Sequence, residues 1–306
     1  YTGFKVNSGE YKLMGLAPYG KPIYKDLILN NLIDVKEDGS FILNMKYFSY
    51  CTDLVMTSPF FDDLFGGQRR SEESKITQRE MDLASSIQSV LEYVVIKLAR
   101  DIAKSTNEQN LCLAGGVALN CVANGKLVRE KLFKNIWIQP ASGDAGGSLG
   151  ATLAFWHLEQ GNKRIVNNFD NMKGSYLGNE FSQAEIENEL LTIGAKFRSF
   201  DYDELISKTV ECLSNEKAIG WFQGRMEFGP RALGARSIIA DPRSPNMQKQ
   251  LNLKVKYRES FRPFAPSVLE EYVNDWFEHD TESPYMLLVT DIKKDKRHTM
   301  TEDQDK

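Results

Sequence analysis

The residues best suited to chemistry are the basic side chains of residues 225–262. This stretch carries nine Lys or Arg against three Asp or Glu, a local charge of +6 in a chain of formal charge −4. Guanidinium groups bind phosphate oxygens in pairs, which favours anion binding. A solvated basic face is the alternative, but interleaved glycines and aromatic residues favour an oxyanion pocket, with single-stranded RNA a lesser option. The candidates are Arg225, Arg231, Arg236, Lys254, Arg258 and Arg262.

Two glycine-rich loops indicate a second kind of site. Residues 113–120 place paired glycines after an apolar strand, where backbone N–H groups and a helix N-terminus can hold a phosphate; a tight turn explains the pattern equally well. Residues 142–147 place Asp144 between glycines, which suits a cation beside phosphates, although a helix cap is the ordinary alternative. Because the loops are one strand apart, together they favour a nucleotide–metal site. The candidates are Gly115, Gly116, Gly143, Gly146 and Asp144.

A compact segment near the start, residues 9–20, carries two further candidates. The carboxylate of Glu10 could accept hydrogen bonds from ribose hydroxyls, and Lys12 could reach a phosphate. By composition, an ordinary loop leading into a turn is an equal alternative.

The elements that position these loops follow from hydrophobic spacing. Apolar residues recur at three- and four-residue intervals over 74–105, which predicts a long amphipathic helix, whereas residues 1–73 are typical of loops and short strands. Strands and helices then alternate, which indicates an α/β layer with a mainly parallel sheet and ligands at the carboxyl ends of its strands. The predicted order is strand 110–113, helix 117–130, strand 135–139, loop 140–147 and helix 148–159.

The later part of the chain predicts a second domain. Residues 160–180 are polar and predict a linker, so we expect domains at 1–165 and 175–306. Ser182 followed by Glu185 is typical of a capping box at the start of a helix over 181–193. Further expected elements are strands 218–222 and 237–240 and a helix beginning within 245–251.

The composition is that of a globular protein. Hydrophobic residues make up 42% and charged residues 26% of the 306, and the acidic total charge argues against nonspecific nucleic-acid binding. No run of about 18 apolar residues exists, so no membrane span is expected. The four cysteines are scattered without a CxxC pair, which favours a reducing, cytoplasmic location.

Five segments in a fixed order resemble the carbamoyltransferase family that includes the nodulation-factor and antibiotic-tailoring O-carbamoyltransferases. They span residues 9 to about 268, and the arginine motif followed by FRPFAP is highly specific. The segments are GEYKLMGLAPYGKP, LAGGVALNCVANGKL, PASGDAGGSLGAT, GRMEFGPRALGARSIIADPR and KYRESFRPFAPSV.

The resemblance implies an actin-like ATP-binding lobe, similar to sugar kinases and threonylcarbamoyl transferases, followed by a YrdC-like α+β domain. In that scheme carbamoyl phosphate and ATP form a carbamoyl adenylate in the second domain, and a hydroxyl of a small-molecule acceptor attacks it in the first. Asp144 resembles the family's metal-binding aspartate, with iron suggested and magnesium as the alternative. Asn120 falls in the nucleotide loop with Gly115 and Gly116, while Glu10 and Lys12 border the nucleotide. The six basic candidates fall in the carbamoyl-phosphate and ATP region.

The chain also departs from the family pattern. The front lobe with its paired metal-binding histidines and the far C-terminal segment are absent, so we interpret the chain as an internal fragment that is inactive alone. Three alternatives stay open: a noncatalytic nucleotide-binding module, a transferase acting on tRNA or in hydrogenase maturation, and a small-molecule kinase of the actin-like fold. The sequence leaves the oligomeric state open, a homodimer included.

Overall fold

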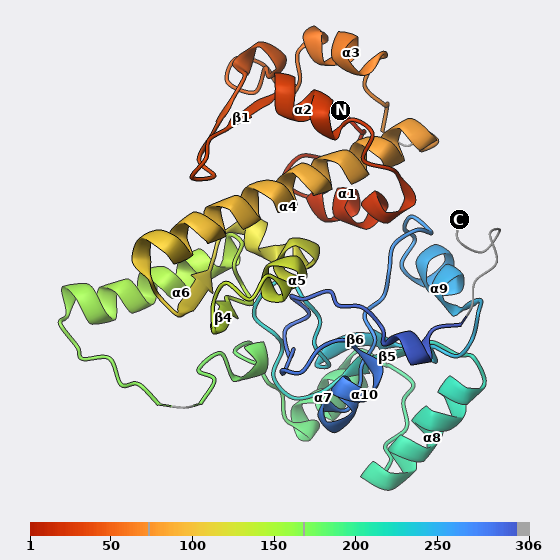
Figure 1. The fold of residues 1–306 in the computed structure, drawn as a ribbon. Helices are drawn as coiled ribbons and strands as arrows, with labels where there is room; N and C mark the ends of the chain where they lie inside the picture. Colours follow the sequence, from red (N-terminus) through yellow and green to blue (C-terminus); the bar gives the residue numbers. More distant parts are fainter. Residues whose placement is uncertain (73, 168, 299–306) are drawn as a thin grey trace.

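The computed structural model describes residues 1–72, 74–167 and 169–298, so part of the predicted linker and the end of the predicted second domain lie outside it. Helices alternate with one parallel and two antiparallel strand pairs, which confirms a mixed α/β class (Figure 1). Up to residue 159 the elements are α1 (Glu10–Leu16), α2 (Lys25–Asn31), β1 (Ile33–Val35), β2 (Phe41–Leu43), α3 (Pro59–Phe65), α4 (Gln78–Thr106), β3 (Asn110–Leu113), α5 (Cys121–Arg129), β4 (Asn135–Ile138) and α6 (Ala145–Ala154). The later elements are α7 (Gln183–Thr192), α8 (Tyr202–Ser214), β5 (Ile219–Phe222), β6 (Arg236–Ile239), α9 (Met247–Gln250) and α10 (Val273–Trp276).

Helix α4 is the central support of the N-terminal part, and it confirms the predicted long helix. A capping box of Thr77 and Glu80 starts it, and Asn107 in the left-handed conformation ends it. Leu83 and Val94 pack into one core with α2 and α3, while Ile96 packs into another beneath the helix. The helix therefore joins the first 65 residues to the β3–β4 layer, as Figure 1 shows.

The prediction of only loops and short strands for residues 1–73 was wrong. In addition to the antiparallel pair β1–β2, the segment contains three helices of seven residues each. Helices this short depend on tertiary packing rather than on a visible periodic pattern. Leu16, for example, is fully buried and packs with Ala84 of α4.

The predicted strand–loop–helix repeat is confirmed with shifted helix boundaries. β3 and β4 are parallel, with Leu113 opposite Ile138. The helix expected at 117–130 is a short 3₁₀ turn followed by α5, because Asn120 interrupts it and accepts from the N–H of Ala123 as the α5 cap. Helix α6 begins at Ala145, three residues earlier than expected, within the second glycine-rich loop.

The predicted elements of the later part are present. Ser182 and Glu185 form the expected capping box of α7, and β5 pairs antiparallel with β6. The helix expected from 245 is α9, a single turn followed by a π turn. The sequence analysis assigned no element to α8, which is capped by Asp201, whose side chain accepts from the N–H of Glu204.

The two halves of the chain share one hydrophobic cluster. Met172, from the predicted linker, and Leu287, from near the end of the described chain, are buried with Ala118 and Ile138. Tyr285 donates a hydrogen bond to Asp170, and burial followed by this contact raises the pKa of the tyrosine. The chain therefore returns to the β3–β4 unit at residues 285–289. None of the helices in the described ranges is both long and apolar enough to span a bilayer.

Candidate functional site

The two glycine-rich loops contact each other at the carboxyl ends of β3 and β4. The N–H of Gly115 donates to the carbonyl oxygen of Ser142 over 2.8 Å. Gly115 has φ +98°, a backbone conformation that residues other than glycine rarely adopt. A side chain at Gly146 would overlap the carbonyl oxygen of Ala141. Glycine is therefore required at both positions for this packing, and the loops predicted to act together do lie together.

The arginine motif reaches the same junction. Gly229, at φ +122°, approaches Ala141 so closely that an added Cβ would lie 3.3 Å from the Cβ of that alanine. Arg231 then extends to the first loop, where its Nη2 donates to the carbonyl oxygen of Leu119 over 3.2 Å. Among the described residues its buried Nε has no hydrogen-bond partner. Three motifs separated in sequence thus meet at one place, which we name the loop junction (residues 114–120, 140–147 and 228–235).

Glu227 holds the arginine motif in shape, and the sequence analysis did not single it out. Its side chain is fully buried, and its carboxylate accepts from the N–H groups of Leu233 (2.7 Å) and Ala235 (2.8 Å) and from Nε of Arg236 (2.9 Å). Burial alone would raise the pKa of Glu227, but these hydrogen bonds outweigh it and lower the pKa to about 2. Glu227 is the one acid within the arginine motif at residues 224–237, and this was the available signal.

A second basic cluster forms where α1 meets residues 256–264. Lys12 pairs with Glu259 over 2.7 Å, and the guanidinium of Arg262 lies 4.5 Å from the ring centroid of Tyr11. Burial, followed by the neighbouring Arg258 and Arg262, lowers the pKa of Lys256. Four basic side chains share the one carboxylate of Glu259, and the excess positive charge favours an anion. We name this the α1 cluster (Lys12, Lys256, Arg258 and Arg262).

Asn252 fixes the loop of the α1 cluster and was also missed. It is fully buried, its amide donates to the carbonyl oxygen of Arg262 over 2.9 Å, and its Oδ1 accepts from Nε of Arg258 over 2.6 Å. Only the folded structure reveals this, because an asparagine in a polar stretch carries no distinguishing pattern.

The six basic candidates therefore occupy several places rather than one. Arg231 reaches the loop junction, Arg258 and Arg262 belong to the α1 cluster, and Arg236 is paired with Glu227. Lys254 is exposed in the turn after α9. A role in substrate binding stays a prediction for each of them.

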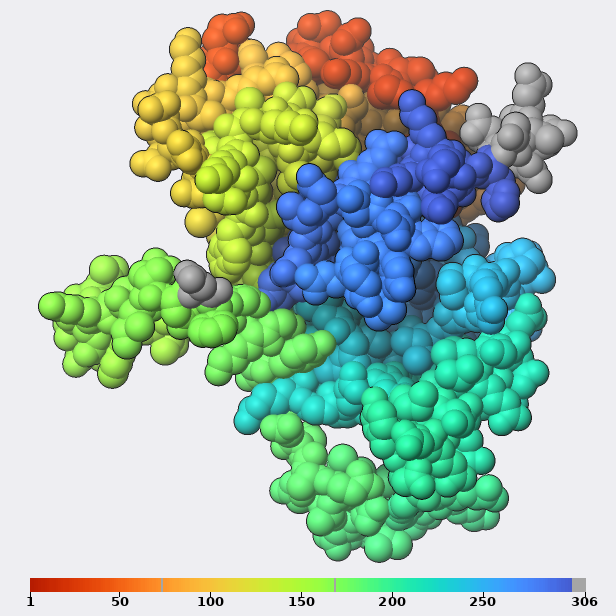
Figure 2. All heavy atoms as spheres, turned by 60° about the horizontal axis from the view of Figure 1, so that its bottom comes forward, coloured from red at the N-terminus to blue at the C-terminus, as the bar shows by residue number. Residues whose placement is uncertain are grey.

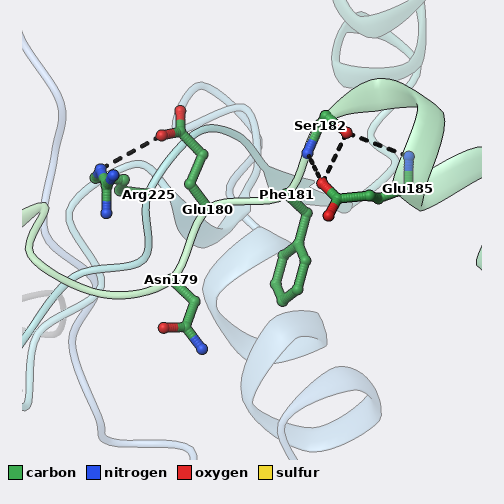
Figure 3. A pocket seen from close by; sticks show the side chains of 6 residues that line it. All are labelled: Asn179, Glu180, Phe181, Ser182, Glu185 and Arg225. Carbon is green, nitrogen blue, oxygen red and sulfur yellow. Dashed lines mark hydrogen bonds and ion pairs between the residues drawn. The ribbon is translucent and has the colours of Figure 1, made fainter.

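Arg225 lies apart, on the wall of an open pocket at the start of α7 (Figure 3). It forms an ion pair with Glu180 over 3.3 Å, and both side chains are about half exposed. The other acid of the pocket, Glu185, is engaged by the cap of α7. Most polar groups of this pocket are thus already partnered within the chain.

The remaining candidates take local structural contacts. Glu10 accepts from the N–H groups of Asn7 (2.7 Å) and Gly9 (3.1 Å) at the start of α1. Asn120 exchanges hydrogen bonds with Gln88 of α4, at 2.9 and 3.1 Å. Gly116 and Gly143 complete the two loops, and an added Cβ on Gly143 would only touch Leu119.

Asp144 is exposed at the start of α6. Among the residues that the structure describes, no group of three or more His, Cys, Asp or Glu side chains could hold a metal ion. One carboxylate does not make a metal site, so the described residues do not fit a complete one.

Family comparisons show which family these motifs belong to. Residues 1–153 match the model of the carbamoyltransferase N-terminus, and residues 210–303 match that of the carbamoyltransferase C-terminus. The chain belongs to the carbamoyltransferase family. The resemblance drawn from the five motifs is thereby confirmed.

Relatives of this carbamoyltransferase chain are about twice as long. It is 59% identical over 307 residues to an uncharacterised protein of Synechocystis sp., covering 100% of this chain and 50% of the relative. It is 37% identical to nodulation protein NolNO of Sinorhizobium fredii, covering 98% and 42%, and 38% identical to nodulation protein NolO of Bradyrhizobium diazoefficiens, covering 95% and 51%. The chain thus spans about half the length of the curated relatives it matches.

Proposed function

We propose that the full-length protein is an ATP-dependent carbamoyltransferase. Carbamoyl phosphate, ATP and water give a carbamoyl adenylate, pyrophosphate and phosphate. The hydroxyl of a small-molecule acceptor then takes the carbamoyl group and releases AMP. In this proposal an actin-like lobe with the two glycine-rich loops binds the adenylate, and a YrdC-like domain with the arginine motif forms it. The observation that carries the proposal is the match to both carbamoyltransferase models, the first across the glycine-rich loops and the second across the arginine motifs.

The placement of fixed positive charge supports this chemistry. Both substrates are polyanions that repel each other, so bringing them together requires preorganised cations. Arg231 has an unpartnered Nε at the loop junction, and the α1 cluster gathers basic side chains around Glu259. Holding two reactants in line can contribute up to about 7–11 kcal/mol. Glu227 and Asn252 are positioning residues, because each accepts a hydrogen bond from an arginine and holds its loop in place.

The reaction test measures nucleotide products of the full-length protein. With ATP and carbamoyl phosphate we expect pyrophosphate release that depends on carbamoyl phosphate, and AMP once an acceptor is supplied. ADP formation without a need for carbamoyl phosphate would favour a kinase instead. ATP binding in calorimetry with no binding of carbamoyl phosphate would favour a noncatalytic module.

Arg231→Ala tests the assignment of the arginine motif. Removing a preorganised donor from developing charge typically costs about 100-fold in rate or more, so we expect a loss of that order in carbamoyl-phosphate-dependent pyrophosphate release. Arg243→Ala is the matched control, because Arg243 belongs to the same basic stretch but is exposed and paired with Asp241. Equal activity of the two variants would remove Arg231 from the site.

A bound metal is also part of the proposal, and no step of the reaction is routed through it. Asp144 would supply one ligand, with the others coming from outside the described residues. Elemental analysis of the full-length protein should find less bound iron or magnesium in Asp144→Asn than in the unmodified protein. Equal metal content in the two proteins would remove Asp144 from the ligands.

A further inference from the structure

The β3–β4 sheet is covered on one face only. Leu113 and Ile138 point into the shared hydrophobic cluster, whereas Cys112 and Trp137 alternate with them onto the other face. Cys112 is exposed, and 43% of the Trp137 surface remains accessible. Parallel sheets are normally covered on both faces, and two strands alone do not make a stable sheet. Within the described residues, this layer is incomplete.

Helix α6, which follows β4 directly, is also uncovered. No residue of α6 is buried, although most of its side chains are apolar or small. The accessible fraction is 48% for Leu153 of α6, and it is 58% for Phe155 and 54% for Trp156 in the π turn that continues the helix. Figure 2 shows this part of the chain, in green, projecting from the rest of the molecule. Large apolar side chains exposed together on one helix indicate a contact surface.

We propose that the open face of the sheet (Cys112 and Trp137) and the exposed apolar residues of α6 and the turn after it (Leu153, Phe155 and Trp156) are covered by polypeptide of the same full-length chain that lies outside residues 1–306. The relatives supply the length argument, because the match to the Synechocystis protein uses all of this chain but only 50% of that protein. About as many residues again are therefore available to complete the layer. Completion of the sheet by further residues also explains why the parallel pair β3–β4 has free edges, since parallel pairs are stable as parts of larger sheets.

Cysteine labelling in the full-length protein tests this inference without any substitution. Cys51 and Cys112 are both free and exposed in residues 1–306, so each should react with a maleimide if nothing further covers it. We expect Cys51 to react at once. In the native protein Cys112 should react at least about ten-fold more slowly than Cys51, and unfolding should remove this difference. Site-resolved mass spectrometry measures both rates in one sample.

Two outcomes would overturn the inference. Equal reactivity of Cys112 and Cys51 in the native protein would show that the face is open. Protection of Cys112 that disappears on dilution to a monomer would show that a second copy covers it instead. The outcome is independent of the proposed reaction, because labelling requires no catalytic activity.

A substitution gives a second measurement. Trp137→Asp would place a charge under the covering segment and should lower the melting temperature of the full-length protein by several degrees. Leu54→Asp is the control, because Leu54 is fully exposed in a loop and should tolerate the change. Equal tolerance of both substitutions would contradict the inference.

Discussion

At the scale of single residues, Glu227 gives a stability prediction with a defined pH window. Glu227→Gln keeps the size of the side chain but removes its charge, and hydrogen bonds to a buried charged group are worth on the order of 1–3 kcal/mol. We expect a loss of unfolding free energy of that order at pH 7. The pKa of Glu227 is lowered from 4.5 to about 2, so its contribution is present above pH 4.5 and is lost as the pH falls towards 2.

Thermal or urea unfolding at pH 7 and pH 3 measures this difference. The gap between the unmodified protein and Glu227→Gln should narrow at the lower pH. Glu180→Gln is the matched control, because its ion pair with Arg225 is about half exposed on both sides and should contribute little. A gap for Glu227→Gln that is as small as the control's at pH 7 would refute the role assigned to this carboxylate.

The individual candidates could be proposed from the sequence, but their partners could not. Arginines among glycines predict anion binding, because the chemistry of the side chain is local information. The pair of Lys12 and Glu259 joins residues 247 positions apart, and Asn252 is distinguished only by complete burial. Such contacts depend on tertiary packing, which leaves no pattern in a short stretch of sequence.

At the scale of elements, two similar capping boxes should differ in their effect on stability. Thr77→Ala removes the cap of α4, which carries ten buried residues, and should cost about 1 kcal/mol of global stability. Ser182→Ala removes the cap of α7, which has no buried residue, and should mainly fray that helix. Urea unfolding, with circular dichroism as the probe, compares the two; an equal loss would mean that α7 is as integral to the fold as α4.

Elements with a periodic or capping signal of their own were mostly predictable, and the short helices of the first 73 residues were not; α8 was overlooked despite its cap at Asp201. The spacing of apolar residues predicted α4, and Ser182 with Glu185 predicted the start of α7, because both signals are contained in the elements themselves. Helices α1, α2 and α3 have seven residues each and rely on packing against other elements. The early start of α6 also escaped prediction, since Ala145 to Gly147 have the composition of a loop.

At the scale of the whole molecule, residues 285–289 join the C-terminal part to α5. Asn124 donates to the carbonyl oxygen of Leu287 over 3.0 Å, and the N–H of Val289 donates to the carbonyl oxygen of Cys121 over 3.1 Å. This contact between residues 285–289 and α5 was not predictable, because Asn124 and Leu287 are 163 positions apart. It depends on Gly125, where a side chain would overlap the carbonyl oxygen of Val289.

Gly125→Ala should therefore release residues 285–289 from α5. Hydrogen exchange followed by mass spectrometry should show loss of amide protection in that segment, beyond any change in α5 itself. Gly220→Ala is the control, because Gly220 is exposed in β5 with no atom near an added Cβ, and alanine should be tolerated there. If the segment kept its protection in Gly125→Ala, the close approach of α5 and Val289 would not be what holds the two halves of the chain together.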